Sequence, residues 1–303
     1  MTMKTQKKLS YALLVLPALV VYLAVVAFPT IFSVILSLTN YNGGLIFGNP
    51  DIEVVGFTSY RWMFTEPTRS FYTSLRNNLL IVGVSVFGQI PLGFILAYIL
   101  NQKLIKRGRG FFQSMIFLPY VISPIIIGVL FNAMIINPRS LYWEVARFFN
   151  PDIQFTLHSN PMLPVLFVIL WMFTGFYMII FLAHMQRIDP AILEAARIDG
   201  ANEPRVLRHI VLPAMTSEIV TCAILAISGS LKTFDLIYAM TNGGPAGQTR
   251  VLSLFMYLSA FSGAPNYPLA NAISTVMVII SIILIVVVRW AAKLFDRHGG
   301  YGK

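Results

Sequence analysis

The chain is poor in charged residues. Only 11% of its 303 residues are Asp, Glu, Lys or Arg, whereas a soluble domain carries about 25%. Hydrophobic residues make up 57% of the chain, and the mean hydropathy is +0.74. A soluble core of this size cannot hide so much apolar surface. The composition therefore argues against a disordered chain and a secreted disulfide scaffold, and it indicates an integral membrane protein.

Cysteine and histidine are also scarce, which excludes several kinds of site. The single cysteine, Cys222, lies in an apolar run, so we expect a small buried side chain and no intramolecular disulfide. No two histidines have the spacing of metal ligands; they are His158, His184, His209 and His298. The motifs GxxxxGKS/T, GxSxG and HExxH are absent as well. We therefore expect no metal site, no catalytic residues and no ATP bound through a Walker A loop.

Basic residues outnumber acidic ones, 22 to 12, which gives a formal net charge of +10. A basic chain can indicate a nucleic-acid partner. In a membrane protein, however, Lys and Arg accumulate in cytoplasmic loops without binding any partner there. We therefore predict that the chain binds no nucleic acid.

Six apolar segments are long enough to cross a lipid bilayer. A helix rises about 1.5 Å per residue, so a span needs about 20 apolar residues. The first segment follows a basic stretch, as a signal peptide does, but it is too long for one and is expected to remain as a span. The sequence thus predicts an all-α membrane protein with six transmembrane helices in one domain, residues 1–303. The spans lie at about 11–38, 74–100, 111–136, 162–184, 218–238 and 269–292.

The basic residues are distributed unevenly among the loops. One set lies before the first span, in the loop between spans two and three, in the loop between spans four and five, and at the C-terminal end of span six. These residues are Lys4, Lys7, Lys8, Lys103, Lys106, Arg107, Arg109, Arg187, Arg197, Arg205, Arg208, Arg289, Lys293, Arg297 and Lys303. The opposite loops hold Arg61, Arg69, Arg139, Arg147 and Arg250. Because Lys and Arg concentrate on the inner side, both termini are predicted to be cytoplasmic.

Ionisable residues are rare within the spans, and Lys232 and Asp235 are the chief exceptions. They stand three residues apart, which places them on one face of a helix. Unpaired, each would cost about 2.5–3.5 kcal/mol at the membrane centre. We therefore predict a structural ion pair between them. The scarcity of other buried acids and bases argues against a membrane enzyme and against a carrier driven by protons or sodium.

The loop at residues 185–213, between spans four and five, contains clear helix boundaries. Asp189 followed by Pro190 is typical of a helix start. Gly200 suits the left-handed conformation that follows a last helical turn. Pro204 then begins a second helix. The predicted loop is a helix, a sharp glycine bend and another helix.

One face of this loop carries small side chains. Ala196 and Gly200 stand four residues apart and are neighbours on a helix surface, with Ala195 beside them. Glu194 adds one charge. Such a smooth patch suits close docking of a soluble partner, although composition alone also fits a solvated surface helix.

The spacing in this loop resembles the EAA motif of permeases of binding-protein-dependent ABC transporters. That motif runs Glu-Ala-Ala, three residues, Gly, nine residues, Ile, one residue, Leu-Pro. Every fixed position is matched here, by Glu194, Ala195, Ala196, Gly200, Ile210, Leu212 and Pro213. The resemblance therefore favours the docking interpretation.

Other stretches are similar to the carbohydrate branch of that family, the maltose and glycerol-phosphate types. They are Leu16–Ala18, Leu38–Tyr41, Phe117–Pro119, Lys232–Tyr238 and Thr241–Pro245. The residues between Gly200 and Ile210 lack the aromatic side chains that many relatives carry, and Glu203 and Pro204 stand there instead. The resemblance implies the type I importer permease fold and import of a sugar or oligosaccharide.

The resemblance also implies a set of partners. A second, similar permease would pair with this chain in the bacterial inner membrane. Two ATPase subunits would dock on the EAA loops and hydrolyse ATP, so this chain would bind no cofactor itself. A solute-binding protein outside the membrane would deliver the cargo. ATP binding would draw the loops together and turn the permeases from inward-facing to outward-facing.

A sugar path would need aromatic faces and uncharged hydrogen-bonding groups. Positions in spans four and five line the path in maltose-type permeases, which by resemblance indicates Trp171, Thr174, Phe176, Tyr177, Ser230 and Thr233. Ser230 and Thr233 share one helical face. Ser, Thr and aromatic residues also pack membrane helices together, so a structural role stays open for each of them.

Two alternatives remain beside a sugar importer. The same machine could carry another cargo, such as glycerol phosphate or a polyamine; an anionic cargo would favour basic residues along the path, and only Lys232 is available. A stand-alone secondary carrier would transport without an ATPase.

Overall fold

The computed structural model describes residues 3–46, 48–102, 108–136, 144, 147–148 and 161–299. Throughout these ranges the chain is helical, and its only β-type pairing is an isolated bridge between Thr39 and Val54. The chain divides into two compact units. One consists of Met1–Arg69 with Phe255–Val278, and the other of Ser70–Leu254 with Ile279–Lys303. Several basic residues used to predict the orientation lie outside the described residues: Lys103, Lys106, Arg107, Arg139 and Lys303.

The first unit holds the N-terminal helices and the start of the last helix. Its elements are α1 (Met3–Tyr22), the π-helical turn η1 (Leu23–Ala27), α2 (Phe28–Leu36) and α3 (Thr58–Thr65), with most of α15 (Leu252–Phe261) and the first part of α16 (Tyr267–Gly299). The Ser33 hydroxyl donates to Asn271 Oδ1 at 2.6 Å, which joins α2 to α16. The rings of Tyr41 and Tyr267 lie 6.1 Å apart. The hydroxyls of Ser37 and Tyr60, 2.7 Å apart, add a further polar contact within the unit.

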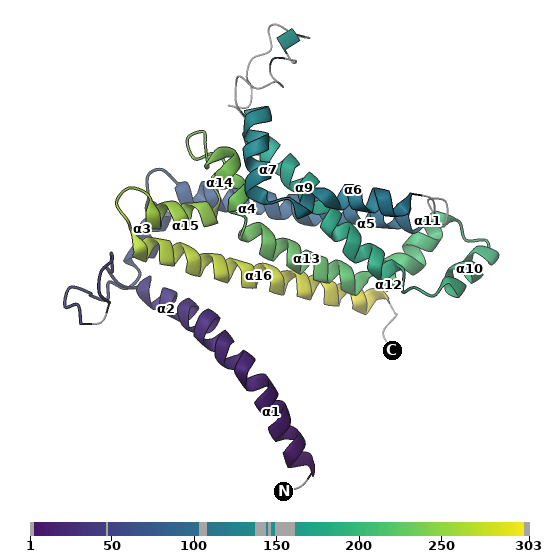
Figure 1. Ribbon diagram of the computed structural model, residues 1–303, viewed down its shortest axis with the longest axis horizontal. Helices are drawn as coiled ribbons and strands as arrows, with labels where there is room; N and C mark the ends of the chain where they lie inside the picture. The colour runs from purple at the N-terminus through teal and green to yellow at the C-terminus, as the bar shows by residue number, and fades with distance from the viewer. Residues whose placement is uncertain are drawn as a thin grey trace. The chain divides into compact units, whose positions relative to one another are not determined.

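The second unit contains the other spans and the loop of the EAA motif (Figure 1). Its elements are α4 (Ser70–Val84), η2 (Ser85–Gln89), α5 (Ile90–Asn101), α6 (Arg109–Val121), α7 (Pro124–Phe131), η4 (Asn132–Ile136), α9 (Met162–Met185), α10 (Pro190–Ile198), α11 (Glu203–Val206), η6 (Leu207–Val211), α12 (Leu212–Ala214), α13 (Thr216–Leu231) and α14 (Asp235–Thr241). Within this unit α9 is central and packs against both α5 and α6.

The long apolar helices occupy the ranges expected for four of the spans. Helices suited to crossing a membrane are Leu13–Leu36, Ser70–Asn101, Met162–Met185 and Tyr267–Lys293. Two further candidates are bent pairs: Arg109–Val121 with Pro124–Ile135 at 87°, and Glu203–Ala214 with Thr216–Leu231 at 67°. Counting each pair as one span gives up to six by length and composition, although Glu203–Ala214 belongs to the predicted loop 185–213 and only Thr216–Leu231 to the predicted fifth span.

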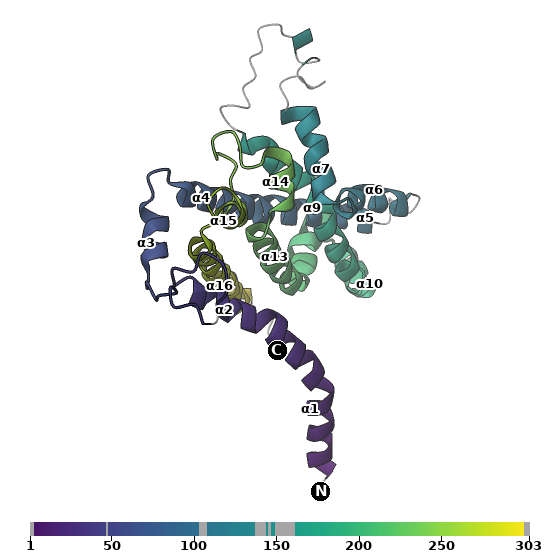
Figure 2. The same cartoon turned by 60° about the vertical axis from the view of Figure 1, so that its left-hand side comes forward.

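The range 111–136, expected to be one span, is broken in the middle. The chain is extended at Ile122 and Ser123, and α7 then leaves α6 at 87° (Figures 1 and 2). The cause is Pro124, whose ring excludes the helical conformation at the preceding residue. α7 packs against α14 rather than continuing along α6.

Several π-helical turns stand directly before prolines. η1 ends two residues before Pro29, η2 two residues before Pro91, and η6 two residues before Pro213. A proline within a helix has no N–H and clashes with the carbonyl four residues earlier. A wider turn at that place lets the helix continue without the clash. The prolines thus explain why these helices contain a wider π-helical turn instead of ending.

The prediction of an ion pair between Lys232 and Asp235 is wrong for this conformation. It assumed one helix over 218–238, but α13 ends at Leu231 and α14 begins at Asp235. The two side chains therefore lie on opposite sides of a break and are both exposed. Elsewhere in the described part of the chain, His184 contacts Glu218 at 2.9 Å and Arg197 forms an ion pair with Glu203, and neither contact involves this couple.

Candidate docking loop and polar hollow

The first helix of the loop has the predicted boundaries. The Asp189 carboxylate accepts a hydrogen bond from the Ala191 N–H at 2.9 Å, and Pro190 is the first helical residue of α10. After α10, Gly200 adopts φ +82°, a left-handed conformation. The Gly200 N–H bonds to the Arg197 carbonyl at 3.1 Å, and the Ala201 N–H bonds to the Ala196 carbonyl at 2.9 Å. This pair of bonds is a Schellman motif, which closes the helix and turns the chain sharply.

The second helix begins directly after the bend. The Asn202 side chain accepts a hydrogen bond from the Arg205 N–H at 3.1 Å and caps α11, whose first residue is Glu203. The chain then runs through η6 and α12 to Met215, where it bends by 67° into α13. Both helices of the loop are therefore fixed by side-chain caps, and the bend between them by the glycine.

The EAA residues divide between an outer and an inner side of the loop. The exposed ones are Glu194, Ala195, Gly200, Leu212 and Pro213, and the partly buried ones are Ala196 and Ile210. Ala196 and Ile210 pack on the buried core of the second unit. The outer residues are those available to a partner.

Two exposed isoleucines beside the motif were not predicted. Ile192 and Ile198 flank Ala195 at intervals of three residues, and Ile198 is 86% exposed. Residues spaced in this way share one helical face, so the outer side of α10 carries an apolar stripe. The spacing was readable in the sequence, and it extends the smooth patch predicted from the alanines alone.

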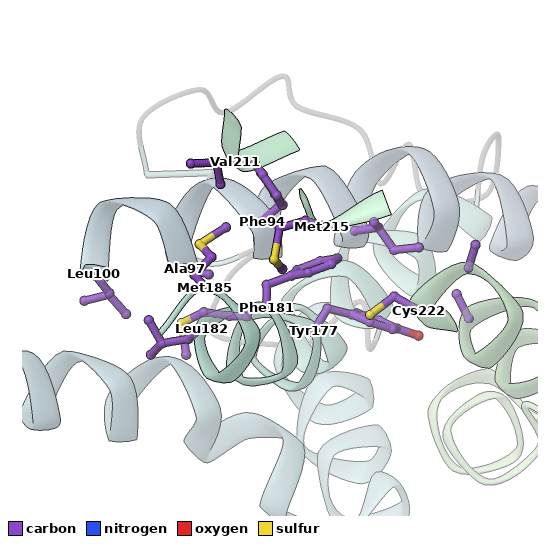
Figure 3. Close-up of a cluster of buried hydrophobic side chains, with 14 of the residues drawn as sticks. Phe94, Ala97, Leu100, Tyr177, Phe181, Leu182, Met185, Val211, Met215 and Cys222 are labelled. Atoms are coloured by element: carbon purple, nitrogen blue, oxygen red, sulfur yellow. The ribbon is translucent and has the colours of Figure 1, made fainter. Parts of the chain in front are cut away.

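Buried side chains hold the loop to the spans. Val211 and Met215 lie in one cluster with Phe94 of α5 and Phe181 of α9 (Figure 3). The rings of Phe94 and Phe181 meet edge to face, with centroids 5.4 Å apart. The end of the loop is thus packed into the same core as the second and fourth spans.

A polar contact fixes the loop at a second place. Arg197 Nε donates to Glu203 Oε1 at 2.9 Å, and Tyr98 Oη donates to Glu203 Oε2 at 2.8 Å. The hydrogen bond from Arg197 holds the pKa of Glu203 below its ordinary value, and the same bond raises the pKa of Arg197. The sequence showed Glu203 only as a departure from the family pattern, because its partner Tyr98 is far away in the chain.

The candidate path residues fall into two groups. Tyr177, Ser230 and Thr233 line one small hollow of about 60 Å³, which we call the polar hollow. Its other lining residues are Ile81, Ser85, Gln89, Ile169, Phe173, Ala226 and Gly229. Uncharged polar groups and two aromatic rings therefore meet in it, and none of its lining residues is charged.

The remaining three candidates do not line the polar hollow. The Trp171 ring packs against Phe131 with centroids 5.7 Å apart, and the Phe176 ring stacks on Tyr120 at 4.8 Å. The Thr174 hydroxyl donates to the carbonyl of Leu170, one turn earlier in its own helix. The two ring contacts are those of helix packing, the role that the sequence left open for these residues.

Two polar residues of the second span complete the hollow and were not predicted. Gln89 Nε2 donates to the Ile169 carbonyl at 2.7 Å, and the Ser230 hydroxyl donates to the Ser85 hydroxyl at 3.0 Å. Ser85 and Gln89 stand four residues apart within the stretch 79–97 of the second span, which is otherwise apolar. Polar residues so placed are a usual sign of a functional site in a membrane helix, so this signal was present in the sequence.

Comparisons with known proteins agree on one family. The family model described as "Binding-protein-dependent transport system inner membrane component" matches residues 89–298. The probable ABC transporter permease protein YurN of Bacillus subtilis is 33% identical over 93% of this chain and 95% of its own length. The lactose transport system permease protein LacF of Rhizobium radiobacter is 30% identical over 93% of each chain.

A solved structure shows the same fold. A chain of a bacterial alginate ABC transporter, crystallised in complex with a pentasaccharide-bound periplasmic protein, superposes with a TM-score of 0.79 at 21% identity. The superposition covers 99% of this chain and 98% of that one. The all-helical type I permease fold predicted from the sequence is therefore confirmed. The chain belongs to the family of inner membrane components of binding-protein-dependent transport systems, and it is an ABC importer permease rather than an enzyme.

Proposed function

We propose that this permease carries a sugar or oligosaccharide across the bacterial inner membrane. The observation that supports this cargo most directly is the polar hollow. Its hydroxyl and amide groups come from Ser85, Gln89, Ser230 and Thr233, beside the ring of Tyr177. Hydroxyl-rich, uncharged ligands are bound by such groups together with aromatic faces. The similarity to LacF, a lactose transport system permease protein, points in the same direction.

The chemistry of the hollow disfavours the alternative cargoes. Glycerol phosphate would call for a basic side chain, and a polyamine for acidic ones. The hollow is lined by neither. Lys232 is exposed and stands outside the hollow, so it offers no anion site there.

The loop supports docking of an ATPase. Its outer side exposes Glu194 and Ala195 together with the apolar stripe of Ile192 and Ile198, and its ends are anchored in the core. An exposed apolar stripe on a polar loop is typical of an interaction surface. In our proposal two ATPase subunits bind the EAA loops of this chain and of a second, homologous permease.

The other components of the transporter follow from the same proposed function. A solute-binding protein outside the cell membrane delivers the sugar, and both termini of this chain face the cytoplasm. The ATPase subunits bind and hydrolyse ATP, and this chain binds no cofactor. No nucleic acid takes part. A secondary carrier of the same cargo would instead transport without ATP.

The test is uptake into proteoliposomes that contain this chain with its second permease, ATPase and binding protein. A panel of neutral mono- and oligosaccharides is compared with glycerol 3-phosphate and spermidine, with and without internal ATP. We expect uptake of at least one neutral sugar that requires ATP. Uptake restricted to the charged solutes would refute the cargo, and uptake without ATP or ATPase would refute the coupling.

A further inference from the structure

The carboxylate of Glu203 lies at the meeting point of three helices. It accepts hydrogen bonds from Arg197 of α10, from Tyr98 of α5 and, at 3.3 Å, from the amide of Gln102 just after α5. Glu203 itself is the first residue of α11. One side chain thus ties both helices of the loop to the end of the second span.

Apolar packing beneath α10 is incomplete at this place. A cavity of about 240 Å³ separates α10 from the ends of α5 and α9. Leu193 and Arg197 line it on the α10 side, and Tyr98 and Gln102 on the α5 side. Leu193 and Ala196 of α10 pack on the buried core, and beside the cavity the polar contact at Glu203 joins α10 to α5.

The second span leads from this contact to the polar hollow. α5 follows η2 without a break, and η2 contributes Ser85 and Gln89 to the lining. Tyr98 stands nine residues after Gln89, a rise of about 13 Å along a helix. A displacement of Tyr98 along the helix axis can therefore reach Gln89 through one continuous helix.

We propose that Glu203 is a positioning residue that passes the movement of the docking helix α10 to the second span and so to the polar hollow. The inference rests on the proposed function, in which an ATPase moves α10. Glu203 touches neither cargo nor ATP. It acts by keeping Arg197 and Tyr98 on one carboxylate, so that α10 and α5 move together.

The test uses the complete complex and a readout that needs no identified cargo. A cysteine is introduced by Thr233→Cys at the hollow, and its labelling by an impermeant thiol reagent from outside is measured with and without MgATP. The native Cys222 is fully buried, and the protein without Thr233→Cys gives its background. Co-purification of the ATPase and ATP hydrolysis are measured on the same samples.

Two variants remove the link by small changes. Glu203→Gln keeps the size of the side chain and removes its charge, and Tyr98→Phe removes one hydroxyl. We expect each to lower the ATP-dependent increase in labelling by roughly 2- to 30-fold, the range for residues that carry coupling between sites. ATP hydrolysis and co-purification should persist. The double variant should be little worse than Glu203→Gln alone, because both changes break one contact.

Glu218→Gln is the matched control. It alters a contact of the same length, 2.9 Å, between the Glu218 carboxylate and His184 Nδ1, which joins α9 to α13 without α10. Its ATP-dependent labelling should match that of the parent. Parent-like labelling in both Glu203→Gln and Tyr98→Phe would overturn the proposal, as would loss of ATPase binding in Glu203→Gln. Failure of the proposed function itself would show in the parent complex, as absence of ATPase binding.

Discussion

The Ser230 hydroxyl of α13 donates a hydrogen bond to the Ser85 hydroxyl of η2 at 3.0 Å, and both residues line the polar hollow. The second and fifth spans are therefore joined at the place where the cargo is proposed to pass. Ser230 is 4% exposed. A larger side chain at this position has no free surface to occupy except the hollow itself.

The first prediction follows from this bond. Ser230→Leu should lower ATP-driven sugar uptake by about tenfold or more, because the added side chain fills a cavity that a ligand needs. Insertion and ATPase binding should stay normal. Uptake in proteoliposomes and co-purification are the measurements.

Ser228→Leu is the matched control for this change. Ser228 lies two residues earlier in α13, is only half-buried and does not line the hollow. It should transport as the parent does. Equal loss of uptake in both variants would show that leucine disturbs α13 in general, and normal uptake by Ser230→Leu would place the path elsewhere.

Gly200 allows a test of the bend in the docking loop. A β-carbon there would meet no atom within 4 Å, so the cost of substitution comes from φ +82° alone. That cost is roughly 1 kcal/mol for Ala, and it is smaller for Asn, which tolerates the left-handed conformation. Gly200→Asn should therefore keep more coupled transport than Gly200→Ala.

Gly200→Asp adds a charge on the exposed side of the loop. We expect normal insertion, with loss of ATPase co-purification or with ATP hydrolysis that no longer drives uptake. Glu194→Ala should be milder, since it removes one contact and leaves the bend intact. Fully coupled transport by Gly200→Asp would mean that this loop does not dock the ATPase.

Features set by neighbouring residues were predictable from the sequence, and those set by distant ones were not. Asp189 and Gly200 form their capping bonds within their own helix, so their spacing sufficed to place α10. The break before Pro124 is also set by a neighbouring residue, but it was not predicted because residues 111–136 form one long apolar run. The contact of Glu203 with Tyr98 joins residues 105 positions apart, and no local pattern indicates it.

The candidate path shows the same division. Ser230 and Thr233 were indicated by the family resemblance and by a spacing of three residues, and both line the hollow, although α13 ends at Leu231 and Thr233 lies beyond it. Trp171 and Phe176 have the right chemistry, but their rings are used in packing against Phe131 and Tyr120. Which face of a helix meets a cavity depends on its neighbours, and a span that is apolar all round does not reveal it.

The contact between α6 and α9 depends on a glycine. A β-carbon at Gly175 would overlap the carbonyl oxygen of Ile116 in α6. Gly175→Ala should therefore destabilise the protein by about 1–3 kcal/mol, as overpacking does. The measurement is the thermal unfolding midpoint in detergent.

Gly83→Ala provides the comparison for this variant. Gly83 lies in α4, and a β-carbon there would meet no atom within 4 Å. It should be neutral or slightly stabilising, because Ala favours a helix over Gly by about 1 kcal/mol. Equal midpoints for the two variants would mean that α6 and α9 do not approach closely at Gly175.

The lowered pKa of Glu203 predicts how its contribution to stability depends on pH. A carboxyl whose pKa is lowered by folding stabilises the protein above its unfolded pKa, and this stabilisation is lost as the pH falls through the folded pKa. The difference in unfolding midpoint between the parent and Glu203→Gln should thus be constant from about pH 8 to pH 5 and should shrink only below about pH 4. A difference that already shrinks near neutral pH would contradict the lowered pKa. The side chain is half exposed, so the midpoint difference should be small.

Docking of a cytoplasmic ATPase requires that the EAA loop face the cytoplasm. The predicted orientation follows from the excess of Lys and Arg in the loops on that side. Single cysteines introduced by Arg187→Cys and Arg208→Cys should resist an impermeant thiol reagent in intact cells and react after permeabilisation. Those introduced by Asp51→Cys and Gln248→Cys should react in intact cells, because both positions are exposed and lie in loops that are predicted to face the opposite side. The buried Cys222 should add little background in either state. Labelling of position 208 from outside would reverse the orientation. An ATPase in the cytoplasm could then not reach α10, and the apolar stripe of Ile192 and Ile198 would need a partner outside the cell instead.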